Sequence, residues 1–197
     1  MTAERLRVLV AAPDPTVLAG CYDGVSARLV EQAGFHAAHM SGFAVAGSLL
    51  GRPDVGLLTM TEMADAASRI ARVLSIPLLA DADTGYGNAL NVVRTVETYI
   101  AGGVAGMHLE DQQMPKRCGH LAGKTVIPAD EMAGKIRAAI DTREAVGTDI
   151  VIIARTDARA DEGLDAALER ARRYRDAGAD LLFVEALQSP AEVETVA

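Results

Sequence analysis

Short apolar runs that alternate with amphipathic segments constrain the fold of this 197-residue chain more than any other feature. Six runs of four or five residues recur along it: 17–20, 37–40, 76–80, 106–109, 150–154 and 181–184. The segments that follow them repeat apolar residues at three- and four-residue spacing, which is typical of helices: 24–33, 61–74, 89–101, 129–143 and 163–177. Near-continuous apolar strands that alternate with helices predict a parallel sheet covered by helices.

Six β/α units are compatible with two architectures. A doubly wound sheet can use six strands, whereas a closed (β/α)8 barrel of the TIM type requires eight. The chain ends at Ala197, soon after the sixth run and partway through what resembles another helix. We therefore predict an α/β fold in which residues 1–197 form a single β/α-barrel domain. We expect this domain to be C-terminally incomplete, with about six of the eight units of a barrel.

Composition excludes several classes of partner. Half of the residues are apolar, but the net charge is −8 and the basic residues are scattered, which argues against nucleic acid or an anionic membrane. No apolar run approaches the roughly 18 residues that a membrane span needs, and residues 1–10 do not resemble a secretory signal. Two cysteines, Cys21 and Cys118, are too few for a disulfide framework. We expect a soluble, cytoplasmic protein.

Charged side chains follow four successive apolar runs, where parallel β/α folds carry their chemistry. Most come in pairs spaced i, i+2, which places both members on one face of a strand: Asp81, Asp83, His108, Glu110, Arg155, Asp157 and, unpaired, Glu185. Carboxylates gathered at one edge of a sheet would repel one another without a cation, and hard oxygen ligands suit Mg²⁺ or Mn²⁺. A structural interpretation stays open for each part, because Asp-x-Asp is common in turns and Arg155 could simply pair with Asp157.

The segment 111–128 is long for a β/α connection, whose usual length is about 2–6 residues. Loops of this length are commonly lids. Within it, Cys118 stands beside Lys116, Arg117 and His120, and neighbouring cations favour the reactive thiolate. We interpret Cys118 as catalytic and Cys21 as an ordinary packing residue.

Five segments of the chain together resemble the isocitrate lyase/PEP mutase superfamily. They are residues 51–56, 81–87, 108–112, 116–120 and 155–157. The resemblance extends from about residue 17 to the end of the chain, and its cysteine motif is similar to that of the members that cleave carbon–carbon bonds. The most similar branch contains 2-methylisocitrate lyase, 2,3-dimethylmalate lyase and carboxyphosphonoenolpyruvate phosphonomutase.

The resemblance implies a role for each matching residue. Asp81, Asp83 and Glu110 would hold Mg²⁺, directly or through water. The catalytic group would comprise Cys118, His120, Arg155 and Glu110. The residues that bind the substrate would be Ser41, Gly42, Phe43, Asp54, Cys118, Gly119, Arg155 and Glu185.

These roles imply a Mg²⁺-dependent carbon–carbon lyase that cleaves a 2-hydroxy di- or tricarboxylate to a 2-oxo acid and a second carboxylate. Cys118 would act as the general acid. Two alternatives remain open, a phosphonomutase that forms a P–C bond on the same metal site and a non-catalytic metal-binding homologue. Phe43 is bulkier than the glycine common at this position in 2-methylisocitrate lyases, which leaves the substrate's alkyl group undecided. The family also implies a homo-oligomer, often a tetramer.

Overall fold

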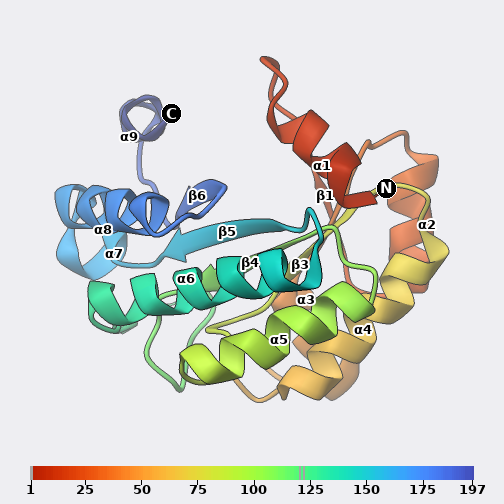
Figure 1. Ribbon diagram of the computed structural model, residues 1–197, viewed down its shortest axis with the longest axis horizontal. Helices are drawn as coiled ribbons and strands as arrows, with labels where there is room; N and C mark the ends of the chain where they lie inside the picture. Colours follow the sequence, from red (N-terminus) through yellow and green to blue (C-terminus); the bar gives the residue numbers. More distant parts are fainter. Residues whose placement is uncertain (1, 120, 122) are drawn as a thin grey trace.

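The computed structural model describes residues 2–119, 121 and 123–197, which fold around one parallel sheet (Figure 1). The six strands within these residues are β1 (Ala19–Cys21), β2 (Ala38–Met40), β3 (Leu78–Asp81), β4 (Gly106–Glu110), β5 (Val151–Thr156) and β6 (Leu181–Val184). They are hydrogen-bonded in the order β1-β2-β3-β4-β5-β6, and every pair is parallel. A doubly wound sheet would reverse this order at a switch point, whereas a barrel keeps sequential neighbours. The predicted barrel-type α/β fold is therefore confirmed.

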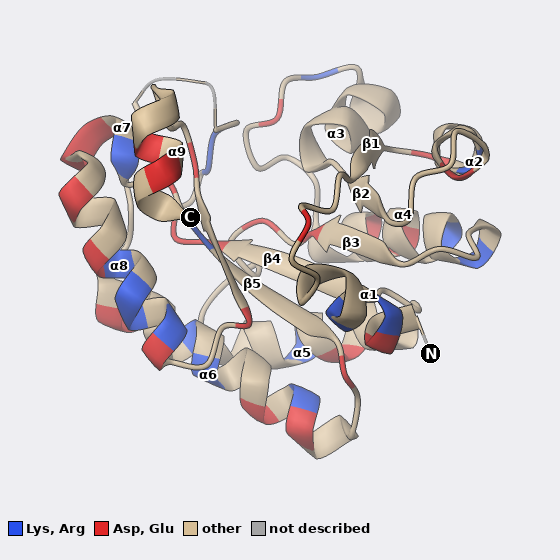
Figure 2. Ribbon diagram, turned by 90° about the horizontal axis from the view of Figure 1, so that it is seen from above, with Lys and Arg blue, Asp and Glu red and all other residues tan. Residues whose placement is uncertain are grey.

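The helices of the described residues are α1 (Thr2–Val10), α2 (Gly24–Gln32), α3 (Gly42–Leu50), α4 (Met60–Val73), α5 (Ala89–Ala101), α6 (Ala129–Val146), α7 (Arg159–Glu162), α8 (Leu164–Asp176) and α9 (Pro190–Val196). Seen from above, the sheet is curved, and α4, α5, α6 and α8 lie along its outer side (Figure 2). Each of these helices packs against the next one in the series. This arrangement leaves the carboxyl ends of the strands free to form a site.

Local sequence chemistry sets the helix ends. Thr59 caps α4 through a capping box with Glu62, and Asn88 does the same for α5 with Asn91. Glycines that follow three of the helices have positive φ values of 88° at Gly34, 83° at Gly103 and 107° at Gly178. These signals explain why the predicted helices and the observed ones differ by at most three residues at either end.

The core lies between the sheet and the outer helices. Its largest fully buried side chains include Tyr99, Met107, Ile136 and Tyr174. A second apolar cluster joins Leu6 of α1 to Val151 and to the amino ends of the neighbouring strands. Helix α1 thus packs at the end of the sheet opposite the charged residues.

Two features of the observed fold differ from the prediction. Strands β3, β4 and β5 extend one or two residues beyond their apolar runs, so Asp81, Glu110 and Arg155 lie within strands rather than after them. The ladder continues because Glu110 pairs with Arg155 in register between β4 and β5. Helices α1, α3 and α7 were also not predicted from periodicity.

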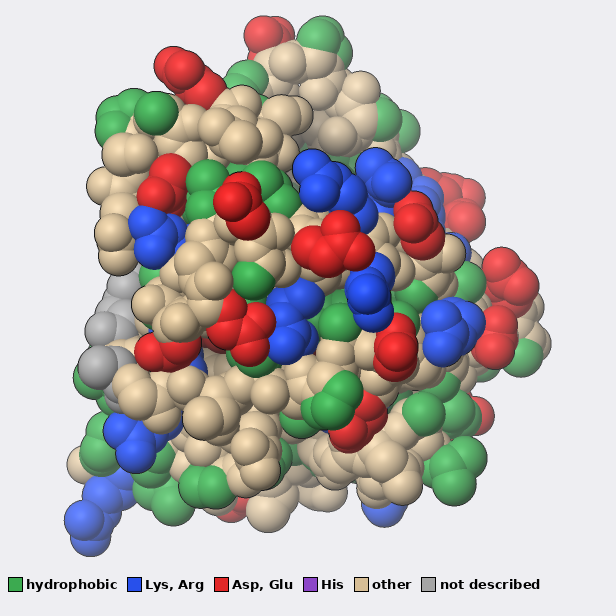
Figure 3. Space-filling model, turned by 90° about the vertical axis from the view of Figure 1, so that its left-hand side faces the viewer, with side chains coloured by type: hydrophobic (Ala, Val, Ile, Leu, Met, Phe, Trp, Pro, Cys, Tyr) green, Lys and Arg blue, Asp and Glu red, His purple; other side chains and the backbone are tan. Residues whose placement is uncertain are grey.

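The outer helices carry mixed charge. Acidic and basic side chains are interspersed over the face that includes α7 and α8 (Figure 3). Arg173 of α8, for example, pairs with Asp130 of α6 at 3.0 Å. In the part of the chain that the structure describes, none of the helices has the length and apolar character needed to cross a bilayer.

Candidate active site

The carboxyl ends of the strands surround a cavity of about 470 Å³. Its lining residues are His39, Ser41, Phe43, Pro53, Asp54, Asp81, His108, Glu110, Lys116, Arg117, Cys118, Gly119, Leu121, Arg155, Phe183 and Glu185. Of the predicted site residues outside this set, Gly42 and Asp83 contact residues that line the cavity. His120 lies outside the described residues.

Asp81 anchors one side of the cavity. One of its carboxylate oxygens accepts the Gly42 amide at 3.1 Å, and the other accepts the Asp83 amide at 2.9 Å. Burial alone would raise the pKa of Asp81, but His108 and Lys116 outweigh burial and hold that pKa below its ordinary value. Asp81 therefore carries negative charge into the site.

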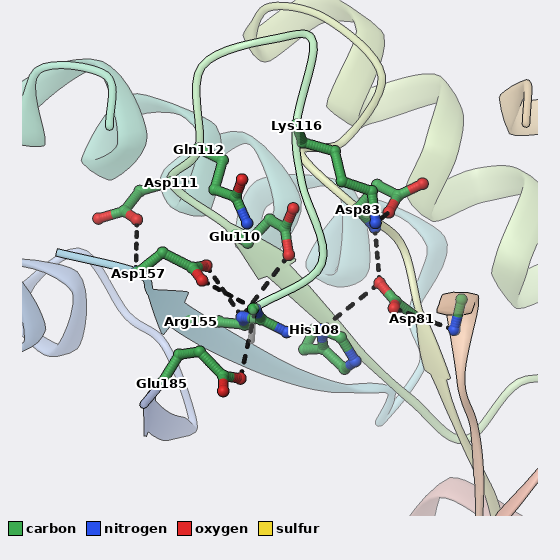
Figure 4. A network of polar contacts seen from close by, with 12 residues as sticks. Asp81, Asp83, His108, Glu110, Asp111, Gln112, Lys116, Arg155, Asp157 and Glu185 are labelled. Carbon is green, nitrogen blue, oxygen red and sulfur yellow. Dashed lines mark hydrogen bonds and ion pairs between the residues drawn. The ribbon is translucent and has the colours of Figure 1, made fainter. Parts of the chain in front are cut away.

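Asp83 lies directly after β3 with a φ of 45°, in the left-handed region that residues other than glycine rarely adopt. This conformation turns its side chain toward Lys116, whose Nζ lies 2.5 Å from Asp83 Oδ1 (Figure 4). Burial, together with the nearby Asp81, raises the pKa of Asp83 to about 7. A neighbouring cation limits this rise, because its positive charge favours the ionised carboxylate.

Lys116 supplies such a cation from the long loop. Its Nζ also lies 2.7 Å from Asp54, and its side chain is only 2 % exposed. Burial would lower the pKa of Lys116, but Asp83 and Glu110 outweigh burial and raise it. Lys116 is near Cys118 in the sequence, but its ammonium group contacts carboxylates, because the fold brings Asp54 and Asp83 close to it.

Glu110 completes the predicted metal set from the end of β4. Its Oε1 is buried without a hydrogen-bond partner, and burial raises its pKa well above the ordinary value. Oxygen atoms in this condition are suited to a hard divalent cation, which would satisfy them and keep Glu110 ionised. Asp81, Asp83 and Glu110 therefore fit Mg²⁺ by the chemistry of their donors. In the arrangement described for residues 2–119, 121 and 123–197, no three potential ligands converge on one point, and Lys116 Nζ lies among the carboxylates.

Arg155 of β5 forms the opposite wall. Asp157 accepts two hydrogen bonds from it, both 2.9 Å long, and Glu185 lies 3.2 Å from Arg155 Nη2 (Figure 4). The guanidinium also lies 5.2 Å from the centre of the Phe183 ring. The predicted pair of Arg155 with Asp157 exists, and it holds a cation at the cavity wall in a fixed orientation.

A second layer of buried polar groups supports this arginine. Asp111 accepts hydrogen bonds from the Asp157 amide at 2.9 Å, from Thr156 Oγ1 at 2.8 Å and from Tyr174 at 2.7 Å. Asp111 is fully buried, and its burial raises its pKa. Its position directly after Glu110 links the supporting layer to the predicted metal side of the site.

Two histidines lie side by side on the floor of the cavity. His39 and His108 stack with ring centres 5.3 Å apart, and their Nε2 atoms are separated by 3.1 Å. Burial lowers the pKa of His108 to about 4 and also lowers that of His39. We expect both rings to be neutral at pH 7.

The long loop covers the cavity from above. Gln112 and Val126 form an antiparallel bridge at its base, so this segment is held together rather than lacking regular pairing. The Cys118 amide donates to the Asp54 carbonyl at 3.0 Å, and Cys118 is partly exposed, whereas Cys21 is fully buried as predicted. A Cβ atom added to Gly119 would lie 2.5 Å from Arg155 Nη2, so the loop backbone rests directly against the arginine.

Three apolar cavity residues were not among the predicted site residues. Pro53, Leu121 and Phe183 provide apolar surface beside the charged groups. Phe183 belongs to the sixth apolar run, where an aromatic residue would be expected in the hydrophobic core. The only signal for its position is that it alternates with the buried Val184, which places Phe183 on the inner face of the sheet.

A parallel β/α sheet of sequential order, with a cavity ringed by buried carboxylates and an arginine at the carboxyl ends of its strands, defines a barrel-type enzyme. The sequence model described as phosphoenolpyruvate phosphomutase matches residues 6–197. The chain belongs to this family, which is part of the PEP mutase/isocitrate lyase superfamily.

Three curated relatives match almost the whole chain. It is 47 % identical to 2,3-dimethylmalate lyase of Eubacterium barkeri over 99 % of its own length and 67 % of the relative's. It is 49 % identical to the probable 2-methylisocitrate lyase 2 of Corynebacterium glutamicum, covering 97 % and 61 %. It is also 49 % identical to the chloroplastic carboxyvinyl-carboxyphosphonate phosphorylmutase of Arabidopsis thaliana, covering 98 % and 57 %. The chain thus spans about three fifths to two thirds of the length of these relatives.

Solved structures give the same picture. The crystal structure of 2,3-dimethylmalate lyase superposes with a TM-score of 0.96 at 43 % identity, covering 100 % of this chain and 66 % of that one. Oxaloacetate acetylhydrolase in complex with 3,3-difluorooxalacetate superposes with a TM-score of 0.96 at 43 % identity, covering 99 % of this chain and 67 % of that one. Phosphonopyruvate hydrolase in complex with oxalate and Mg²⁺ gives 0.89 and 33 %, covering 100 % and 67 %.

Proposed function

We propose that this protein is a Mg²⁺-dependent carbon–carbon lyase that cleaves a 2-hydroxy di- or tricarboxylate to a 2-oxo acid and a second carboxylate. The observation that carries the proposal is that Arg155, the carboxylates of β3 and β4, and Cys118 face one cavity. Relatives named 2,3-dimethylmalate lyase and probable 2-methylisocitrate lyase support it, since both names describe such a cleavage.

The metal would be held by Asp81, Asp83 and Glu110, directly or through water. When bound, Mg²⁺ would neutralise negative charge that develops on the oxygens of the 2-oxo product. Two features of the chain support this assignment: the unpartnered Glu110 Oε1 and the raised pKa values of Asp83 and Glu110. The neighbour solved with oxalate and Mg²⁺ shows that a related chain binds this ion with a small dicarboxylate.

The remaining steps fall to the chain's own residues. Arg155, held by Asp157 and Glu185, would orient a substrate carboxylate. Cleavage of the carbon–carbon bond leaves its electron pair on the departing carboxylate fragment as an enolate, and Cys118 would supply the proton that quenches it. The loop that carries Cys118 would exclude water from this carbanion. His120 would belong to the same catalytic group, as the family resemblance implies.

The substrate-binding surface would include Ser41, Gly42 and Phe43 at the start of α3, with Asp54 and Gly119 opposite. The Ser41 hydroxyl already accepts the Ala44 amide at 3.4 Å and caps α3, so its backbone is fixed beside the cavity. Phe43 and Leu121 add apolar surface that fits an alkyl substituent on a malate-like acid.

The wider setting is also a proposal. Two free thiols support a reducing, cytoplasmic location. The sequential sheet supports a single β/α-barrel domain over residues 1–197, and the family supports a homo-oligomer.

The decisive assay uses the full-length protein with Mg²⁺ and four substrates: 2-methylisocitrate, 2,3-dimethylmalate, oxaloacetate and phosphoenolpyruvate. Coupled detection of a 2-oxo acid from one of the first two, abolished by Cys118→Ser with metal binding retained, is the expected result. Cleavage of oxaloacetate alone would instead make the protein a hydrolase, like the neighbour named oxaloacetate acetylhydrolase.

A phosphonomutase is the second candidate, because a relative that carries this name is 49 % identical. Formation of a phosphonate from an enolpyruvate phosphate, without cleavage of 2-alkylmalates, would replace the lyase proposal. A calorimetric titration with no heat of Mg²⁺ binding would instead favour a non-catalytic homologue.

A further inference from the structure

All three lysines of the chain, Lys116, Lys124 and Lys135, are buried, with exposures of 2–4 %, while its sixteen other basic residues are arginines. A buried ammonium group is costly unless it is paired and hydrogen-bonded. Lys116 is explained by Asp54 and Asp83, and Lys135 donates to the Thr84 carbonyl at 3.1 Å. Lys124 contacts both the loop backbone beside Cys118 and the carboxylate that holds Arg155.

Lys124 binds one partner on the loop and one on the sheet. Its Nζ donates a hydrogen bond to the carbonyl of Gly119, the residue that follows Cys118. The same nitrogen lies 3.5 Å from Oδ1 of Asp157, just beyond the end of β5. The ammonium thereby ties the backbone next to Cys118 to the body of the molecule.

Asp157 is the carboxylate that orients Arg155. The arginine and, through Lys124, the loop that carries Cys118 therefore both contact Asp157. Its Oδ1 accepts from Arg155 Nη2 at 2.9 Å and also faces Lys124. Asp157 is itself held from behind, since Asp111 accepts its amide at 2.9 Å. Gly119 also lies directly against Arg155, because a Cβ atom on Gly119 would be 2.5 Å from Arg155 Nη2.

We propose that Lys124 is a positioning residue that fixes the Cys118 thiol relative to Arg155 by bridging the Gly119 carbonyl to Asp157. The inference rests on the proposed function in one respect: Cys118 and Arg155 are taken to act on the same substrate. Removing the bridge leaves Arg155 clamped by two hydrogen bonds to Asp157 but releases the Gly119 backbone. Substrate affinity should therefore persist while proton delivery fails.

The test compares Lys124→Met, which keeps the length of the side chain without its charge, with Lys124→Arg. Thr125→Val is the matched control, because Thr125 Oγ1 makes an exposed hydrogen bond to Gln113 in the same loop and touches neither partner of Lys124. Cys118 alkylation by iodoacetamide, followed by intact mass, reports on the loop without requiring any activity. Cys21 is fully buried and gives little background.

Lys124→Met should raise the alkylation rate of Cys118 about fivefold or more and lower kcat about tenfold or more, with KM within about threefold of the wild type. Lys124→Arg should reverse most of both changes. In Thr125→Val, the alkylation rate and kcat should stay within about twofold of the wild type. A merely structural lysine would lower the melting temperature and leave these ratios unchanged. An alkylation rate or a kcat of Lys124→Met within about twofold of the wild type overturns the proposal.

A second measurement decides the matter if Lys124→Met fails to fold. Acetic anhydride labels amines, and with three lysines each site is resolved by peptide mass spectrometry. In the native wild type, Lys124 should react at least about tenfold more slowly than in urea, because its nitrogen is held between two acceptors. Equal rates would overturn the bridge. If the wild type cleaves no substrate but the labelling results hold, the proposed function fails and the bridge stands.

Discussion

Gly119 illustrates how a single backbone position can determine the shape of the site. A methyl group on this residue would lie 2.5 Å from Arg155 Nη2 and 2.6 Å from Glu185 Cδ, closer than Cβ atoms approach other groups. Neither side chain can move away freely, because Arg155 and Glu185 form an ion pair with each other. The loop can therefore approach Arg155 this closely only with glycine at position 119.

Gly119→Ala should accordingly push the loop away from Arg155 and lower kcat/KM by about 100-fold, the scale of a misplacement of about 1 Å. Steady-state assays with whichever of the four candidate substrates the wild-type protein turns over provide the measurement. Gly134→Ala, in α6 with its nearest neighbour at 3.9 Å, serves as the control and should leave activity unchanged. Wild-type activity in Gly119→Ala would show that the close contact is not maintained in solution.

His108 provides a prediction about protonation. Burial lowers its pKa to about 4 in the folded protein, against an ordinary value of 6.5. The unfolded chain therefore binds a proton at a higher pH than the folded one, so this group's contribution to stability is complete above pH 6.5 and is lost as pH falls toward 4. In NMR of the metal-free protein, the His108 ring signals should stay constant from pH 8 to about pH 5. A midpoint near 6.5 would contradict the burial described here.

At this scale the sequence spacing predicted which charged side chains lie near one another. Asp81 and Asp83 are two residues apart, as are Arg155 and Asp157, and residues so close in sequence stay close when the chain folds. The Lys116–Asp54 pair spans 62 residues, and no local pattern reveals which distant carboxylate a lysine will meet. The contact of Lys124 with Asp157 escaped prediction for the same reason.

Helices and strands meet through polar contacts as well as apolar ones. The carboxylate of Glu31 at the end of α2 accepts the Ser75 amide at 2.8 Å and the Ser75 hydroxyl at 2.5 Å. Ser75 lies between α4 and β3, so this contact connects one β/α unit to the next. Periodicity predicted the elements on both sides, because apolar spacing records burial, but it carries no signal for such a polar link.

The Glu31 link should make stability depend on pH. The two hydrogen bonds from Ser75 lower the pKa of Glu31 below its ordinary 4.5. A carboxyl group with a depressed folded pKa stabilises the protein above about pH 4.5, and this contribution is lost as pH falls through the folded pKa. Urea unfolding of the wild type and of Glu31→Gln should therefore differ most at pH 7 and converge only once the pH falls below the folded pKa of Glu31. A difference that is independent of pH would contradict this account.

At the scale of the whole molecule, Asp180 connects several elements at the end of the sheet opposite the site. Asp180, just before β6, accepts from Arg143 of α6 at 2.6 Å and from the Ile152 amide at 2.8 Å. It also accepts from Arg7 of α1 at 3.0 Å. Three segments that are far apart in the sequence thus converge on one carboxylate.

Asp180→Ala should lower the free energy of unfolding by about 2 to 3 kcal/mol, because it leaves two guanidinium groups and a backbone amide without their acceptor. Asp176→Ala is the matched control, since Asp176 is 68 % exposed and pairs with its neighbour Arg175, and it should cost less than about 0.5 kcal/mol. Chemical denaturation with an unchanged slope is the measurement. Similar losses in the two variants would show that the convergence adds nothing.

The architecture as a whole could be predicted because parallel sheets have their own sequence signature, in which buried strands are apolar throughout. The order of the strands could not be derived from periodicity, since doubly wound and barrel-type sheets share the same alternation. The barrel was the predicted architecture of the two, and the pairing of β1 with β2 through to β6 confirmed it.

The left-handed backbone at the rim of the site has a consequence for protein engineering. Ala186, directly after Glu185, has a φ of 61°, which costs an alanine about 1 kcal/mol relative to glycine. Ala186→Gly should therefore raise the melting temperature by a few degrees in calorimetry, and it should also loosen Glu185, whose Oε1 accepts the Ala186 amide. A library selected for heat resistance alone would enrich glycine at this position, and one selected for turnover would retain alanine.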